Sequence, residues 1–127
     1  NDGYWSNVWN NDAKGWCACY WGGRPAETMM FSAAYVAESK WNDTMWKTTD
    51  SAVKFNQLVK DARKELDESK KRDILYECQR LIYDDGGLLC PLFNSYVSAN
   101  SKKIAHGKIA ANWDSDGAKC VERWWFA

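Results

Sequence analysis

The sequence has few of the residues that most catalytic and metal sites require. It contains a single histidine, His106, and no GxSxG, P-loop or GxGxxG motif, so the signatures of the common hydrolases and nucleotide-binding proteins are missing. No stretch of about 18 consecutive apolar residues occurs, and the sequence predicts no transmembrane helix. The 17 Lys and Arg residues balance 17 Asp and Glu residues. This balance gives no electrostatic reason to expect a nucleic acid or an anionic membrane as partner.

The cysteines form no recognisable metal or redox pattern. They are Cys17, Cys19, Cys78, Cys90 and Cys120. An odd number cannot pair completely within the chain, and the spacings match neither a zinc ribbon nor a CxxC motif. The sequence therefore predicts no metal site and no cofactor. It also starts without the charged and apolar segments of a signal peptide, so we expect it to be part of a longer chain.

The clearest pattern is a helical hairpin. Two apolar stripes repeat at spacings of three and four residues, which is typical of helices with one buried face. The first stripe is Phe55, Leu58, Val59, Ala62 and Leu66, and the second is Ile74, Leu75, Cys78, Leu81 and Ile82. Asp67 is expected to cap the second helix, and Gly86-Gly87 to end it in a left-handed conformation.

The remaining segments predict short strands and helices. A short helix near residues 3–10, a turn at 11–15 and a helix starting at Pro25, with Met29, Met30 and Phe31 turned inward, are expected. Residues 36–50 carry no sustained period and predict a surface loop, with Asp50 or Ser51 capping the helix after it. Strands are predicted at Trp16–Trp21, at 88–93 and 94–99, and at 121–127, with a polar crossing segment at 101–108. Helices alternating with strands indicate the α/β class.

The chain is rich in tryptophan, with nine in 127 residues. The segment Trp16-Cys17-Ala18-Cys19-Tyr20-Trp21 concentrates aromatic side chains in one predicted strand. An exposed strand edge can bind an extended ligand through its backbone, and the flat Trp rings supply contact area at low entropic cost. An aromatic core strand has the same pattern, so periodicity leaves both interpretations open.

Other candidate sites are weaker. A thiol enzyme would need Cys17 or Cys19 to reach His106, together with a third residue that orients the histidine. An aromatic interaction module would use residues 1–24 and 120–127 against a protein partner. Asp84 and Asp85 are expected to be solvated charges at a helix end. Asn42-Asp43-Thr44 matches a glycosylation sequon, a triplet that arises often by chance.

The order of motifs resembles the substrate-binding proteins of ABC importers, in the oligopeptide and dipeptide class (solute-binding protein family 5). The likeness begins with Gly15-Trp16-Cys17-Ala18-x-Tyr20 and Trp21-Gly22-Gly23-Arg24-Pro25. It continues with Phe55-Asn56-Gln57-Leu58, Ala62-Arg63-x-Glu65-Leu66-Asp67, Lys71-Arg72, Tyr76-Glu77-x-Gln79, Gly86-Gly87 and Pro91-Leu92-Phe93. Each motif is weak alone, but their order and spacing cover essentially the whole chain.

This resemblance implies the C-terminal part of a bilobal, type II periplasmic-binding-protein fold, with a helix hairpin packed on a small mixed sheet. Residues 1–105 would belong to the second ligand-binding lobe, and 106–127 would cross back to the first, so this chain alone should not form a closed site. The implied protein is an exported periplasmic receptor rather than an enzyme. It would deliver a peptide or similar solute to an inner-membrane permease. The implied ligand contacts are Gly15, Trp16, Cys17, Ala18, Cys19, Tyr20 and Trp21.

Cys19 departs from the family pattern. In oligopeptide binders this position is typically an Asp that pairs with the free ammonium group of the peptide. A Cys carries no permanent charge, and loss of a charge-assisted contact costs about 1.5–3 kcal/mol. The resemblance therefore leaves the ligand open among peptides, sugars, opines, nickel complexes and other solutes. It also implies that Cys17 pairs with an earlier cysteine in some relatives, which would account for the odd number.

Overall fold

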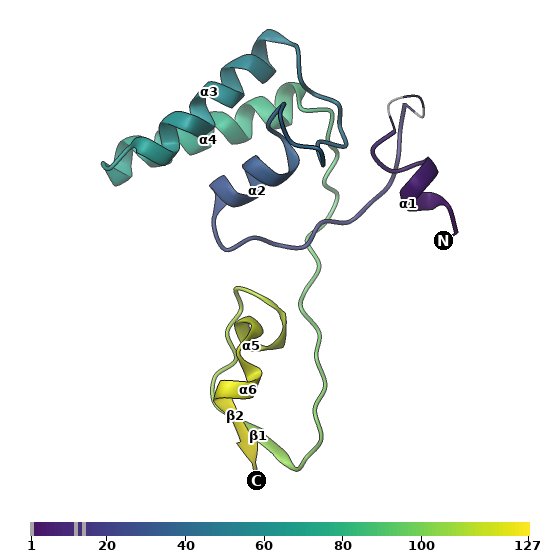
Figure 1. Ribbon diagram of the computed structural model, residues 1–127. Helices are drawn as coiled ribbons and strands as arrows, with labels where there is room; N and C mark the ends of the chain where they lie inside the picture. Colours follow the sequence, from purple (N-terminus) through teal and green to yellow (C-terminus); the bar gives the residue numbers. More distant parts are fainter. Residues whose placement is uncertain (1, 12, 14) are drawn as a thin grey trace. The chain divides into compact units, whose positions relative to one another are not determined.

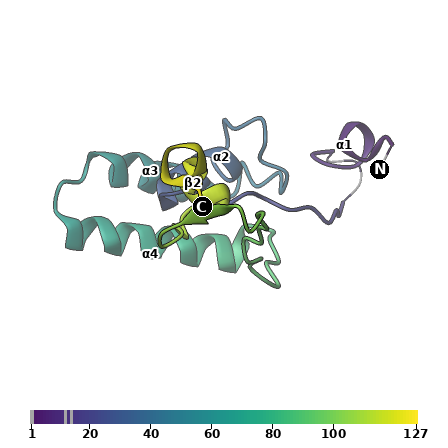
Figure 2. The same ribbon diagram turned by 90° about the horizontal axis from the view of Figure 1, so that it is seen from below.

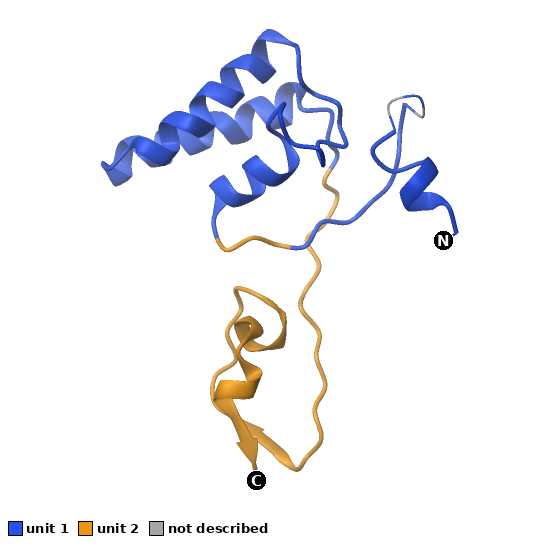
Figure 3. Cartoon of the chain, in the orientation of Figure 1, with its two compact units in different colours: residues 1–22, 26–89 blue, residues 23–25, 90–127 orange. Residues whose placement is uncertain are grey.

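The computed structural model describes residues 2–11, 13 and 15–127, and it shows a small α/β protein. The chain folds as two compact units (Figure 3). The first unit comprises Asn1–Gly22 and Ala26–Leu89, and the second comprises Gly23–Pro25 and Cys90–Ala127. The assignment of 1–105 and 106–127 to two lobes of a receptor stays a prediction. Within the described residues, no helix is both long enough and apolar enough to cross a membrane.

The predicted helical hairpin is confirmed. Helix α3 (Asp50–Lys64) and helix α4 (Glu68–Asp85) run side by side in opposite directions (Figures 1 and 2). Asp67 caps α4 by accepting hydrogen bonds from the backbone N–H groups of Ser69 and Lys70, at 2.9 and 3.0 Å. Helix α3 is capped one residue earlier than predicted, by Thr49, whose Oγ1 accepts from the Ala52 N–H. After α4, Gly87 takes the left-handed conformation with φ of 68°.

The two apolar stripes meet in the core of the first unit. Phe55, Val59 and Ala62 of α3 are buried, as are Cys78, Leu81 and Ile82 of α4. Leu66 was predicted to join them, but it is 92% exposed. The reason is local: α3 ends at Lys64, and Glu65 turns to an extended conformation with ψ of 125°, which removes Leu66 from the helical stripe.

Helix α2 (Glu27–Ala34) covers one end of the hairpin. Its Phe31 ring lies 5.6 Å from the Phe55 ring in an edge-to-face arrangement. The prediction that Met29 also points inward is wrong, since half of its surface is exposed. Met30 packs partly against the core. The helix was predicted to start at Pro25 but begins at Glu27, and its fully buried residues are Phe31 and Ala34.

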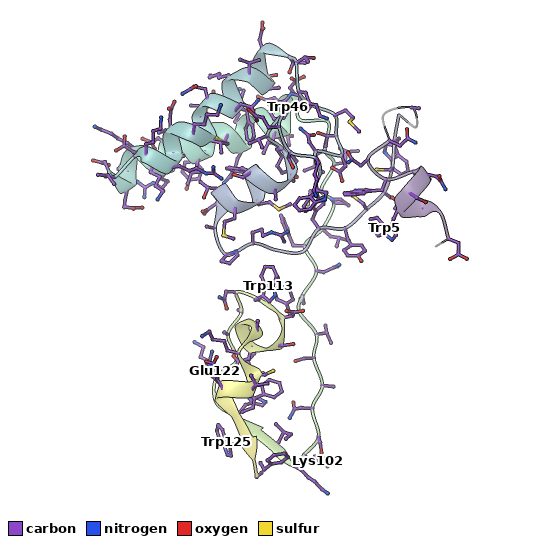
Figure 4. All side chains as sticks on the ribbon, viewed as in Figure 1. Trp5, Trp46, Lys102, Trp113, Glu122 and Trp125 are labelled. Carbon is purple, nitrogen blue, oxygen red and sulfur yellow. The ribbon has the colours of Figure 1, made fainter. Side chains whose placement is uncertain are left out.

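The loop between α2 and α3 is part of the core, and the prediction of a surface loop is wrong. Trp46 is buried, and its ring lies 5.1 Å from that of Phe55. Figure 4 labels it beside the helices of the first unit. Asn42 is fully buried, and its Nδ2 donates to the carbonyl oxygens of Tyr35, Trp46 and Val36 at 3.1, 3.0 and 3.3 Å. An amide held in this way cannot accept a glycan, so the Asn42 sequon is not a modification site.

Asp85 anchors this loop to the end of α4. Its Oδ2 accepts hydrogen bonds from Trp46 Nε1 at 2.8 Å, from Thr49 Oγ1 at 2.9 Å and from the Ser51 hydroxyl. These donors, that of Ser51 most strongly, lower the pKa of Asp85 below its ordinary value of 3.8. Asp85 was predicted to be a solvated charge, but it is instead a structural acceptor that joins α4 to the start of α3.

The lowered pKa of Asp85 predicts a contribution to acid stability. A carboxyl group whose native pKa is depressed stabilises the fold above its unfolded pKa of about 3.9, and the contribution is lost as the pH falls through the lower native value. We expect Asp85→Asn to be less stable than the wild type at pH 7 and to lose less stability between pH 4 and pH 2. Urea unfolding across this range measures both. The neighbouring Asp84→Asn, which removes an exposed partner of Arg80, is the control. An Asp85→Asn profile parallel to the wild type would contradict the assignment.

The predicted strands at Trp16–Trp21, 88–93 and 94–99 are wrong. These residues have neither helical nor strand structure. The segment at 88–93 was expected to be buried, yet Phe93 is 94% exposed. A strand requires a neighbouring strand for its backbone hydrogen bonds, and none of the described segments supplies one here.

The sheet that the structure describes lies in the second unit. Strands β1 (Ile104–His106) and β2 (Trp124–Phe126) pair antiparallel, with Ala105 opposite Trp125. The sheet is thus antiparallel rather than mixed, and β1 falls in the segment predicted as a polar crossing. The predicted C-terminal strand is confirmed only at 124–126, because the short helix α6 (Cys120–Arg123) precedes it.

Asp116 organises the second unit. It belongs to α5 (Asp114–Ala118), a short turn in which Ser115, Asp116 and Gly117 are left-handed. Its carboxylate accepts from the Ala110 N–H at 2.6 Å and from Trp124 Nε1 at 3.0 Å, and it pairs with Arg123 at 3.1 Å. The Ala110 N–H contributes most to lowering the pKa of Asp116. These contacts hold α5 against the last strand.

Candidate ligand-binding site

Three segments of the first unit converge where the predicted ligand-contacting residues lie. Helix α1 is a single turn, Tyr4–Asn7, within the helix predicted near 3–10. The Tyr4 hydroxyl donates a hydrogen bond to the Ala18 carbonyl oxygen. Asn10 Nδ2 donates to the Lys40 carbonyl oxygen at 2.6 Å. These bonds fix the N-terminal turn against the extended segment and against the α2–α3 loop. The predicted turn at 11–15 includes residues 12 and 14, which lie outside the described residues.

The Asp43 carboxylate is the centre of this site. Its Oδ2 accepts hydrogen bonds from Trp9 Nε1 at 2.7 Å and from Trp21 Nε1 at 3.2 Å. The Cys19 thiol donates a third, with Sγ 3.2 Å from the same oxygen. One carboxylate oxygen therefore joins an N-terminal residue, two residues of the predicted ligand-contacting segment and the α2–α3 loop.

Cys19 is held in its protonated form. Partial removal of its sulfur from water, followed by the hydrogen bond to Asp43, raises the pKa of the thiol to about 12. A nucleophilic cysteine needs the opposite, a lowered pKa that yields thiolate at neutral pH. Cys19 is therefore a hydrogen-bond donor in this structure, and its environment gives the thiol-enzyme interpretation no support.

Aromatic rings gather next to the two tryptophans that donate to Asp43. We call Tyr4, Trp5, Trp9, Tyr20 and Trp21 the aromatic cluster. Trp5, labelled at α1 in Figure 4, is its hub, with the rings of Tyr4, Trp9 and Tyr20 at 5.1, 5.7 and 5.9 Å from its own, all edge to face. Such edge-to-face pairs contribute about 0.5–1.5 kcal/mol each beyond the area they bury. The cluster is thus an ordered surface rather than a set of loose side chains.

The predicted ligand contacts divide into an anchored group and an open group. Trp21 packs partly against the core, Cys19 reaches Asp43, and the Ala18 carbonyl oxygen is taken by Tyr4. Trp16 and Tyr20 are both 76% exposed. Gly15, at φ of 67°, is exposed, and Cys17 is half-buried. None of the described backbone–backbone hydrogen bonds involves residues 16–20, so their main-chain groups, apart from the Ala18 carbonyl oxygen that Tyr4 uses, are left to other partners.

Sequence reasoning missed Asp43, Trp5 and Trp9. Asp43 was noted only as the middle residue of a sequon in a loop, and no spacing in the sequence connects it with Cys19, 24 positions earlier. The one signal was the high tryptophan content near the N-terminus. An indole N–H that is removed from water needs an acceptor, and a search for that acceptor would have considered the nearby carboxylates.

His106 lies in the second unit, where its Nδ1 is 2.8 Å from the Gly107 carbonyl oxygen and its ring is 5.1 Å from Trp124. The neighbours of His106 are therefore a backbone carbonyl group and an aromatic ring of its own unit. That unit also contains an open groove of about 550 Å³ lined by 94–98, 109–111 and 113–116, and a shallow apolar one of about 360 Å³ beside Trp125. Neither groove is lined by Gly15 to Trp21.

Each of the five cysteines is unpaired in the structure, including Cys17, for which the resemblance implied a partner. Among the residues that the structure describes, no group of three or more His, Cys, Asp or Glu side chains is placed to hold a metal ion. No family model, no curated protein and no solved structure matches the chain.

Proposed function

We propose that this chain is part of the substrate-binding component of an ABC importer. It captures a peptide or similar small solute between two lobes in the periplasm and delivers it to the permease in the inner membrane. In this proposal the type II binding-protein fold is completed by the first lobe. The chain acts by binding rather than by catalysis.

The observation that carries the proposal is the state of residues 15–21. They form neither helix nor strand, none of the described backbone–backbone hydrogen bonds uses residues 16–20, and of their main-chain groups the Ala18 carbonyl oxygen is the one that accepts from the Tyr4 hydroxyl. An extended ligand can bind such a segment as an added strand, because main-chain groups supply the affinity and alternate side chains the specificity. Trp16 and Tyr20 present large exposed ring surfaces at alternate, even-numbered positions. The Cys19 and Trp21 side chains, at odd-numbered positions, both donate hydrogen bonds to Asp43.

The aromatic surface suits a receptor that tolerates varied ligands. Trp and Tyr provide large contact areas and have only two side-chain torsions to restrict, so they lose little entropy on binding. Tyr20 packs edge to face on the half-exposed Trp5 ring, and contiguous exposed apolar surface commonly marks an interaction site. The hydrogen bonds of Cys19 and Trp21 to Asp43 hold the segment in place. The exposed rings of Trp16 and Tyr20 are available to contact a ligand.

A binding experiment with matched variants tests the proposal. Isothermal titration of the full-length receptor with a mixture of tripeptides, Ala-Xaa-Ala, is expected to give saturable binding. Trp16→Ala is expected to weaken it more than about fivefold, since truncation of a central aromatic contact costs over 1 kcal/mol. Tyr83→Ala is the control, because this tyrosine is 87% exposed on α4, away from the segment. Equal affinities for the two variants and the wild type would place the ligand elsewhere.

A further inference from the structure

The second unit has an excess of positive charge, although the chain as a whole is balanced. It contains six Lys and Arg residues but only three Asp and Glu residues. Two of these three carboxylates are already paired, with Arg123 and Lys119. Lys102, Lys103 and Lys108 are exposed, and they take part in none of the ion pairs described for the chain. Their charges are therefore available to an anionic partner.

Two of these lysines adjoin the shallow apolar groove beside Trp125. Lys102 and Lys103 form the turn immediately before Ile104, where β1 starts. The Lys103 carbonyl oxygen accepts a hydrogen bond from the Ala127 N–H at 2.9 Å, so the same turn also lies beside the end of β2. Figure 4 labels Lys102 and Trp125 at this end of the second unit. The groove is lined by Ile104, Cys120, Val121, Trp124, Trp125 and Phe126.

The apolar side chains of the groove are open to solvent. Val121 and Phe126 are almost fully exposed, and Trp125 is half exposed. Phe126 lies directly opposite Ile104 in the antiparallel pair, so these two side chains share one face of the ribbon. Contiguous exposed apolar surface with a polar rim commonly marks an interaction site. The second unit thus presents apolar side chains next to a turn of two lysines.

A lipid bilayer suits this surface better than a folded protein does. Protein interfaces depend on a few side chains that fill matching pockets, whereas this groove is shallow. Exposed aromatic and aliphatic side chains can enter the boundary between headgroups and acyl chains. Long lysine side chains can keep their ammonium groups at the level of the headgroups above them. Anionic headgroups then attract each lysine that lies near the surface.

We propose that the groove beside Trp125 and the turn of Lys102 and Lys103 dock on the surface of an anionic phospholipid bilayer. The two ammonium groups contact headgroup phosphates. The side chains of Val121, Trp125 and Phe126 enter the boundary beneath them. This inference goes beyond the proposed function, and it requires that the first lobe leave this surface uncovered. The contact is peripheral, and salt weakens it because ions screen the attraction between exposed charges.

Cosedimentation with vesicles tests the charged part of the surface. The full-length protein is expected to bind vesicles of phosphatidylcholine mixed with phosphatidylglycerol, and to bind phosphatidylcholine alone much more weakly. Replacing Lys102 and Lys103 together with Gln is expected to weaken binding to the mixed vesicles roughly twenty- to thirtyfold, about fivefold for each lysine. Replacing Lys64 and Lys70 with Gln is the control, because both are exposed in the first unit and in none of the described ion pairs. Equal losses in the two double variants would overturn the site.

A second pair of variants tests the apolar part. Phe126→Ser is expected to weaken binding to the mixed vesicles about tenfold, since it removes a side chain that enters the bilayer. Phe93→Ser is the control, because Phe93 is equally exposed in the second unit but does not line the groove. Absence of binding by the wild type would overturn the inference. If Phe126→Ser then also lowered the unfolding temperature, the surface would belong to the first lobe. Peptide capture, measured separately, would stand in either case.

Discussion

Replacing Phe55 with Ala is expected to lower the free energy of unfolding of the first unit by about 3–5 kcal/mol, the cost typical of a buried Phe. Phe55 is fully buried, and three other rings pack around it: those of Trp46, Phe31 and Tyr35, at 5.1, 5.6 and 6.5 Å. These rings come from α2 and from the α2–α3 loop, so they cannot all collapse into the space that Phe55 leaves.

Urea unfolding followed by circular dichroism at 222 nm measures this loss, because α3 and α4 supply most of the helical signal. Phe93→Ala is the control of the same chemistry at an exposed position, where changes are usually within about 0.5 kcal/mol. A cost below about 1 kcal/mol for Phe55→Ala, outside the range for buried aromatic residues, would show that the three rings do not form one core.

Replacing Asn42 with Ala is expected to destabilise the first unit by about 3 kcal/mol, because buried acceptors left without a donor cost about 1–3 kcal/mol each. The amide donates to three carbonyl oxygens of the α2–α3 loop, and two of these bonds are fully buried. Asn42→Asp separates lost volume from lost hydrogen bonds. It keeps the shape but directs a negative charge at the same carbonyl groups, so we expect it to destabilise at least as much as Ala at pH 7.

Asn100→Ala is the control for Asn42. Asn100 also donates to two carbonyl oxygens, of Ser101 and Ile104, but it is exposed, and water can replace its amide. Thermal unfolding followed by tryptophan fluorescence compares the variants. If the Asn42 and Asn100 variants unfold at the same temperature, the loop does not depend on the buried amide, and its conformation must be fixed by Trp46 and Asp85 alone.

Local patterns predicted the helical hairpin because both stripes and the Asp67 cap act within a few residues. Apart from Leu66, which is exposed because α3 ends two residues before it, the main failures concern segments whose conformation depends on distant partners. Trp46 is buried because its ring packs against Phe55 and its indole N–H donates to Asp85, which lies 39 positions later in the sequence. The extended segment at 88–93 has strand-forming residues, but strand formation also requires a neighbour to pair with.

The candidate site was also only partly predictable from the sequence. The aromatic segment at 15–21 could be identified from composition, and the structure leaves Trp16 and Tyr20 exposed there. Asp43 could not be identified, because its role depends on a turn of the chain that brings residues 9, 19, 21 and 43 together. Hydrophobic periodicity reports which face of an element is buried, but it says nothing about which polar groups from separate segments will meet.

Asn42 and Asp43 are consecutive residues with opposite surroundings. The first is locked inside the core by three carbonyl groups, and the second is half-buried beside the aromatic rings. The backbone of Asp43 is therefore fixed during folding, and with it the Cys19 and Trp21 side chains that donate to its carboxylate. Under the proposed function, a surface organised in this way before the ligand arrives loses little entropy on binding. Substitutions that loosen the helical core should consequently raise the entropic cost of ligand binding before they unfold the protein. Affinity would then decline in variants whose ligand contacts are all intact.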